Sequence, residues 1–136
     1  MAKKQIKKVR RTKRERKKLR LRKHLVGTDL RPRLCVYKSN LFTSIQVISD
    51  ESGKTLLSAS TKDKEVLDKI SDVKLDGLGD SRSTKSAAAA KALGAHVASR
   101  LGDLEPKNFV FDRNGFIFHG RIKAVADGLK ESGVKI

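Results

Sequence analysis

The sequence contains one cysteine, two prolines and no tryptophan among its 136 residues. The single cysteine, Cys35, excludes a framework of intrachain disulfides and favours a reducing compartment. No apolar run approaches the length of a transmembrane helix, and no apolar segment follows the charged first residues as it does in a secretory signal. We therefore expect a soluble protein that is not secreted.

Acidic residues are scarce as well, with 15 of them against 32 lysines and arginines and a net charge of +17. Residues 1–24 hold fourteen of the basic residues and a single acid, Glu15, and therefore carry +13 of that charge. No core can bury such a segment, because unpaired buried charges are too costly. We interpret residues 1–27 as a basic N-terminal arm and residues 28–136 as one domain, since about 110 residues suffice for one core but not for two.

Three interpretations of the arm compete. A solvated tail would mix the signs of its charges more evenly. A segment that binds a membrane surface needs an apolar face, for which the aliphatic residues of the arm are too sparse. Nucleic acid is the favoured partner, because Lys and Arg displace counterions from phosphates and Arg also stacks on unpaired bases.

The arm also contains a helix start signal. Thr12 and Glu15 stand at the spacing of a capping box, and Gly27 could end the helix that begins there. Like charges three and four residues apart repel each other along such a helix. We therefore expect a helix of about three turns that becomes stable only when nucleic acid neutralises its charge.

The rest of the sequence predicts an α/β (α+β-like) fold. Apolar and β-branched residues predict strands at residues 34–37, 42–49, 54–61 and 108–112, the first of them buried on both faces. Helical spacing predicts a short helix capped by Thr61, a long helix from Ser83 or Thr84 to Leu101, and a last helix from about Gly120 to just before Gly133. Residues 71–81 are interpreted as a mobile loop. We expect a three-stranded antiparallel meander, a fourth strand parallel to the first, and helices packed on the sheet.

Patterns for enzymatic or metal chemistry are weak. Residues 79–86 end in Lys-Ser as a phosphate-binding loop does, but Thr84 stands where glycine must let the backbone wrap a phosphate. The three histidines share no ligand spacing with Cys35 or with the acids, so no metal site is expected. A metal-dependent nuclease is the enzymatic alternative, but the first strand offers no carboxylate and Asp112 alone does not make a site. We expect no catalysis and no cofactor.

Residues 109–123 form the strongest constellation in the chain. Asn114-Gly115 between two apolar triplets is typical of a β-hairpin. We assign Phe109 and Phe111 to the core. Phe116 and Phe118 stand among cations and glycines, a setting that suits stacking on unpaired bases, and core packing is the equally weighted alternative.

The motif FDRNGFIFHGRIKAVAD, residues 111–127, closely resembles the C-terminal signature of the bacterial large-subunit ribosomal protein L18 family. The resemblance extends over nearly the whole chain, through the arginine-rich arm, residues 31–34, 39–40, 46–48 and 59–61, and the alanine-rich helix. It implies a cytoplasmic, non-catalytic constituent of the large ribosomal subunit. Such a protein binds 5S rRNA and helps attach it to the large-subunit rRNA in the central protuberance, beside other 5S-binding ribosomal proteins. The family also implies a loop after the fourth strand, which replaces the hairpin interpretation of Asn114-Gly115.

The resemblance and the arm together give a set of RNA-facing candidates. Three positions depart from the family pattern. Leu41 and Ser44 stand where a basic and an aromatic residue are usual, and Asn114 stands where a small residue, often glycine, is common. A general nucleic-acid-coating protein remains a second alternative outside the family. The candidates are Arg10, Arg11, Arg14, Lys17, Lys18, Arg20, Arg22, Lys23, Arg31, Arg33, Lys38, Ser39, Asn40, Arg113, Asn114, Phe116, Phe118, His119, Gly120, Arg121 and Lys123.

Overall fold

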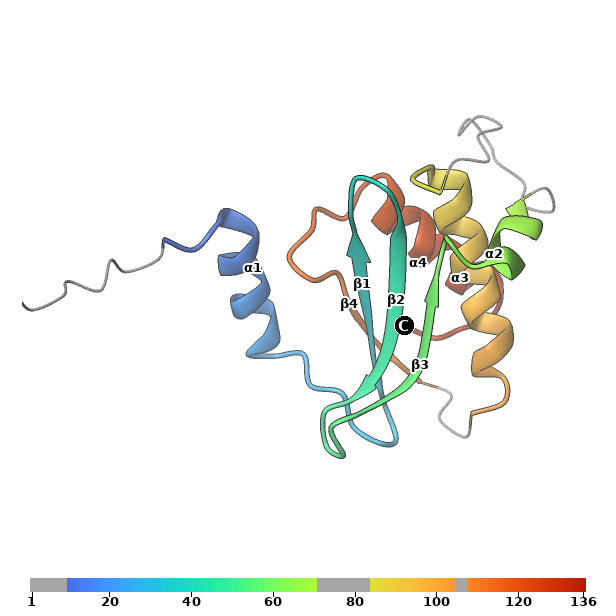
Figure 1. Cartoon of the computed structure of the whole chain (residues 1–136). Helices are drawn as coiled ribbons and strands as arrows, with labels where there is room; N and C mark the ends of the chain where they lie inside the picture. The colour runs from blue at the N-terminus through green and yellow to red at the C-terminus, as the bar shows by residue number, and fades with distance from the viewer. Residues whose placement is uncertain (1–9, 71–83, 105–107) are drawn as a thin grey trace, which may run out of the picture.

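The computed structural model describes residues 10–70, 84–104 and 108–136 (Figure 1). The loop expected at residues 71–81 and most of the segment that resembles a phosphate-binding loop lie outside these residues. The elements, in chain order, are α1 (Lys13–Arg22), β1 (Arg33–Lys38), β2 (Thr43–Ser49), β3 (Lys54–Ser60), α2 (Lys64–Asp68), α3 (Ala87–Leu101), β4 (Val110–Asp112) and α4 (Arg121–Glu131).

The four strands form one mixed sheet in the order β3-β2-β1-β4. Strand β1 pairs antiparallel with β2 and parallel with β4, and Cys35 of β1 lies opposite Asp112 of β4. The predicted meander and the parallel fourth strand are therefore confirmed. Helices α2, α3 and α4 lie together against the sheet, whereas α1 stands apart from them, beside the loop that joins β4 to α4 (Figure 1).

The strands bury alternate side chains, as the period-two pattern requires. In β2, Ile45 and Val47 are fully buried, and across the sheet Leu34 and Val36 of β1 are buried with them. The prediction that β1 is buried on both faces holds through Val36 and is wrong for Tyr37, which is 41 % exposed. Helices α2, α3 and α4 cover only one face of the sheet, so its other face has no helix of this layer over it (Figure 1).

Three helix ends differ from the predicted ones. Helix α1 has the predicted capping box and, with 10 residues, about the predicted three turns, but it ends at Arg22 with Lys23 as its C-cap, so Gly27 does not close it. Asp63, not Thr61, is the N-cap residue of α2. Helix α3 starts after Ser86, whose side chain accepts a hydrogen bond from the backbone of Ala89.

Thr61 and Gly27 are used for tertiary contacts, which explains why they do not cap helices. The Thr61 hydroxyl accepts a hydrogen bond from the backbone N–H of Thr43 (3.1 Å) and donates one to the carbonyl of Thr84 (2.7 Å). Gly27 lies so close to β1 and β2 that an added Cβ would stand 2.6 Å from the carbonyl oxygen of Ile48. Local sequence signals cannot distinguish a cap from such a long-range contact.

Helices α3 and α4 cross at two glycines. A Cβ added to Gly94 would lie 2.4 Å from the carbonyl oxygen of Val125, and one added to Gly128 would lie 2.4 Å from that of Lys91. Gly94 therefore allows α3 and α4 to pack closely. This packing offsets the cost of about 1 kcal/mol that glycine has relative to alanine inside a helix.

Replacement of Gly128 by alanine is expected to lower the free energy of unfolding by about 1–3 kcal/mol, because backbone of α3 must move away from the new methyl group. Urea unfolding of the purified protein measures this change. Gly102→Ala is the matched control, since its added Cβ would meet only the Ser99 carbonyl at 3.4 Å. Stabilisation of the Gly128 variant, as helix propensity alone predicts, would contradict the close crossing.

Candidate nucleic-acid interface

Helix α1 has an inward and an outward side, although seven of its ten residues are basic. Arg14, Lys18, Leu21 and Arg22 recur at helical spacing and are each partly buried. The outward residues are exposed, together with basic residues just before and after the helix. The exposed basic set, which we call the outward face of α1, is Arg10, Arg11, Lys13, Arg16, Lys17, Arg20 and Lys23.

The inward side of α1 lies on the turn that follows β4. Asn114 and Gly115 have positive φ values of 55° and 78°, and the N–H of Phe116 donates to the carbonyl of Arg113 at 3.0 Å. This is the turn chemistry that the Asn-Gly pair predicts. The residues after it form no strand, so the loop implied by the family resemblance is confirmed and the hairpin is not. An added Cβ at Gly115 would lie 2.5 Å from the carbonyl oxygen of Arg14, so α1 and this turn are in direct contact.

Arg14 joins the helix to the aromatic side chains at the end of the sheet. Its guanidinium carbon lies 4.2 Å from the ring centre of Phe116 and 5.5 Å from that of Tyr37. Its Nε donates a hydrogen bond to the carbonyl of Asn114 at 3.3 Å. Cation–π contacts of this kind contribute about 0.5–1 kcal/mol each when partly exposed.

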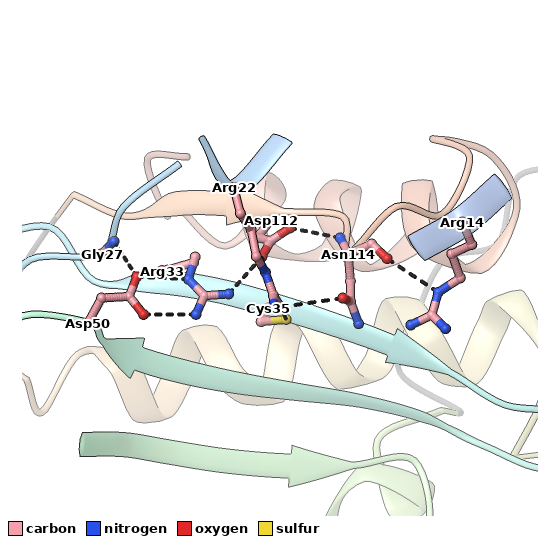
Figure 2. A network of polar contacts seen from close by, with 8 residues as sticks. All are labelled: Arg14, Arg22, Gly27, Arg33, Cys35, Asp50, Asp112 and Asn114. Atoms are coloured by element: carbon pink, nitrogen blue, oxygen red, sulfur yellow. Dashed lines mark hydrogen bonds and ion pairs between the residues drawn. The ribbon is translucent and has the colours of Figure 1, made fainter. Parts of the chain in front are cut away.

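Asp112 is the centre of a buried network that joins α1, β1 and β4 (Figure 2). Its carboxylate is fully buried and accepts hydrogen bonds from Nη1 of Arg33 at 2.7 Å and from the backbone N–H of Asn114 at 2.8 Å. Nε of Arg22 lies 3.6 Å from the same carboxylate, and Nη2 of Arg22 donates to the side-chain oxygen of Asn114 at 3.4 Å. One buried acid therefore holds together a strand, a turn and the last residue of the arm helix.

Arg33 is part of this network and not of the surface. Asp50 takes two hydrogen bonds from its guanidinium, at 2.9 and 3.0 Å, and the backbone N–H of Gly27 donates to the same carboxylate at 2.7 Å. Hydrogen bonds to Asp50 and Asp112 raise the pKa of Arg33, and the bond from Arg33 lowers the pKa of Asp50. Both groups therefore stay charged, and the guanidinium of Arg33 is bonded to two carboxylates of the protein.

The topology places several candidate residues at one end of the sheet. Strands β1 and β4 are parallel, so the turn after Lys38 and the loop after Asp112 lie at the same end. Lys38 Nζ stands 5.4 Å from the ring centre of Phe116, which joins the two segments. Arg121, the first residue of α4, donates to the carbonyl of Phe42 at 3.3 Å and brings the start of that helix to the same place. We call this region the basic end of the sheet; it comprises Lys38, Ser39, Asn40, Arg113, Phe118, His119, Gly120, Arg121 and Lys123.

The candidates differ in how accessible they are. Asn40, His119, Gly120 and Lys123 are exposed, and Phe118 is 43 % exposed beside Phe111. Other candidates have partners within the protein. Ser39 closes its own turn by accepting from the backbone of Phe42, Phe116 lies beneath Arg14, and Asn114 is buried. Arg31 is exposed but precedes β1, at the end of the sheet opposite to the basic end.

Sequence reasoning left out four residues that belong to this surface. Lys13 and Arg16 lie on the outward face of α1. The capping box starts the helix at Thr12, and from that start the helical period places both residues on the same side as Lys17 and Arg20. Tyr37 contacts both Arg14 and Phe116, and Ile117 is 68 % exposed in the β4–α4 loop. No local signal marks Tyr37, because its contacts come from segments far away in the sequence.

The described residues offer no competing chemical site. Cys35 is buried, and burial followed by the charge of Asp112 raises the pKa of its thiol, which makes it a poor nucleophile. His96 is buried between Lys69 and Glu65, and burial lowers its pKa. Within the described part of the chain, no group of three His, Cys, Asp or Glu side chains could hold a metal ion, and no helix is long and apolar enough to cross a membrane.

The chain is similar to known proteins over nearly its whole length. The sequence profile of the family described as "Ribosomal L18 of archaea, bacteria, mitoch. and chloroplast" matches residues 8–136. The chain belongs to the ribosomal protein L18 family. It is similar to the large ribosomal subunit protein uL18 of Thermotoga petrophila (42 % identity, 99 % of each chain), of Desulforapulum autotrophicum (42 %, 98 % of each chain) and of Dictyoglomus thermophilum (40 %, 96 % of this chain and 98 % of the relative). Members of this family are structural ribosomal proteins and not enzymes, so the nuclease alternative is set aside.

Proposed function

We propose that this protein is a structural constituent of the large ribosomal subunit that binds 5S rRNA and helps attach it to the large-subunit rRNA in the central protuberance. Its other partners are then neighbouring 5S-binding ribosomal proteins, and its place of action is the bacterial cytoplasm. Relatives that match the chain over nearly its full length are large-subunit ribosomal proteins, which supports the first part of the proposal. The finer assignment to 5S rRNA rests on the motif in residues 111–127 and on the arrangement of charge.

The observation that carries the proposal is the position of the outward face of α1 next to the basic end of the sheet. Arg14 near the start of α1 contacts Phe116, so the first turn of the helix adjoins the β4–α4 loop. The outward face supplies cations for phosphates along a helical line, whereas the loop supplies Phe118, His119 and an exposed backbone at Gly120. Cations beside exposed aromatic groups suit folded RNA with unpaired bases better than a uniform duplex.

The proposal predicts discrimination between RNAs. The purified chain should bind refolded 5S rRNA several orders of magnitude more tightly than an unrelated RNA of the same size at near-physiological salt. Filter binding or fluorescence anisotropy measures both affinities. Equal affinity for the two RNAs would mean that the +17 charge alone explains the binding, and would favour a general coating protein.

Within this assay, Arg113→Ala should weaken binding to 5S rRNA about tenfold while it changes binding to the unrelated RNA by less than about threefold, because a base or shape contact is lost along with one charge. Arg113 is partly exposed at the basic end of the sheet. Lys54→Ala is the matched control, since it removes one charge from an exposed residue at the start of β3, at the opposite end of the sheet. Equal losses on both RNAs would count against a specific contact at Arg113.

A further inference from the structure

We infer that Gly115 and the β4–α4 turn are a docking site for helix α1 that sets its orientation, so that the arm and the domain read RNA as one rigid surface. The inference rests on the proposed function and extends it to residues that need not touch RNA. A basic arm on a flexible tether would contribute charge to any RNA. A docked helix contributes its charges only where the phosphates match its position.

The contact between α1 and the turn is close enough to require glycine. An added Cβ at Gly115 would stand 2.5 Å from the carbonyl oxygen of Arg14, 3.1 Å from the backbone nitrogen of Lys18 and 3.2 Å from Cγ of Arg14. Two of these three atoms belong to the helix backbone, which cannot rotate away as a side chain can. The Asn114–Gly115 turn therefore packs directly against the backbone of α1.

Polar contacts fix the helix at both ends of this interface. Arg14 in the first turn lies over Phe116 and donates to the carbonyl of Asn114. Arg22, two turns later on the same side, reaches the side chain of Asn114 and the carboxylate of Asp112 (Figure 2). Two anchors about 12 Å apart along a helix define both its direction and its rotation. The same rotation points the outward face of α1 away from the domain.

A helix α1 that must be positioned and a helix α1 that contributes only charge predict different results. The two can be separated because the domain side of the contact can be altered without any change in charge. Gly115→Ala should displace α1 and lower the preference for 5S rRNA over an unrelated RNA about tenfold, while the affinity for the unrelated RNA stays the same. Gly53→Ala is the matched control. Gly53 has a similar positive φ of 66°, but an added Cβ there has no atom within 4 Å, so it introduces the same backbone strain without a clash.

A second pair of variants tests the helix side with the net charge unchanged. Arg14→Lys loses the stacked guanidinium and its bond to Asn114, whereas Arg16→Lys makes the same chemical change on the outward face. If docking orients α1, Arg14→Lys should lower the preference for 5S rRNA over the unrelated RNA. This effect should not add to that of Gly115→Ala, because both substitutions break the same contact. Arg16→Lys should lower that preference less than Arg14→Lys does, because it leaves the contacts of α1 with the β4–α4 turn intact.

The outcomes separate the inference from the function on which it rests. If the unaltered chain does not discriminate between the RNAs, the proposed function fails. If it discriminates but Gly115→Ala has no effect, or has only the effect of Gly53→Ala, docking does not set the orientation and the inference is overturned. If circular dichroism shows that Gly115→Ala is unfolded, the comparison of Arg14→Lys with Arg16→Lys decides alone, and equal losses from the two would overturn the inference.

Discussion

Replacing Asp112 by alanine is expected to lower the free energy of unfolding by about 3–5 kcal/mol, because breaking a buried ion pair leaves its partner uncompensated. The side chain of Asp112 is 0 % exposed and that of Arg33 is 9 % exposed, with 2.7 Å between Nη1 of Arg33 and the carboxylate. The substitution also removes the acceptor for the backbone N–H of Asn114, a buried donor in a turn of positive φ. Arg22 loses its nearest carboxylate at the same time.

Urea or thermal unfolding, followed by circular dichroism, measures this loss. Asp50→Ala is the informative control, since Asp50 binds the same arginine through two hydrogen bonds but its side chain is 32 % exposed, and water can replace it. Its effect should be clearly smaller than that of Asp112→Ala. If the two variants were equally destabilised, burial of Asp112 would not be the decisive property, and the exposed half of the network would matter as much as the buried half.

The fold could be predicted from the sequence because its signals are local and repeated. Alternation of buried residues in β2 and the spacing of apolar residues in α3 and α4 identify the elements, and a long crossover before β4 requires a parallel pairing. The errors lie at residues with two possible uses. Gly27 resembles a helix end but serves a close backbone approach to β2, and Thr61 resembles a cap but bridges Thr43 and Thr84.

The candidate site was harder to predict, because charge indicates a partner but not a direction. All the arginines of the arm look alike in the sequence, yet Arg14 and Arg22 face the domain whereas Arg16 and Arg20 face outward. The distinction depends on Asp112 and Phe116, about 100 residues away along the chain, as in the Arg14–Asn114 bond with its separation of 100. Arg33 likewise looks like a surface cation until its two carboxylate partners are known.

Removal of residues 1–24 is expected to give the largest effect on RNA binding, since it deletes +13 of the net charge of +17. The plot of log K against log salt concentration should become much less steep. Seven exposed basic residues lie on the outward face of α1, and if each contacts one phosphate, the slope should fall by about 5 to 6. Titration of 5S rRNA at several salt concentrations gives the slope directly.

The truncation also removes Arg14 and Arg22, which contact the domain, so a second variant is needed to separate charge from folding. Replacing Lys13, Arg16, Lys17 and Arg20 by glutamine keeps every inward contact of α1 and removes only outward charges. Its slope should fall by about 3 if each residue contacts one phosphate, while its unfolding midpoint stays close to that of the unaltered chain. A slope unchanged by these four substitutions would make the outward face a solvated surface, and RNA contacts would then have to come from the basic end of the sheet alone. A reduced slope with an intact midpoint would instead mean that the basic residues on the outward face of α1 bind the phosphates of the RNA.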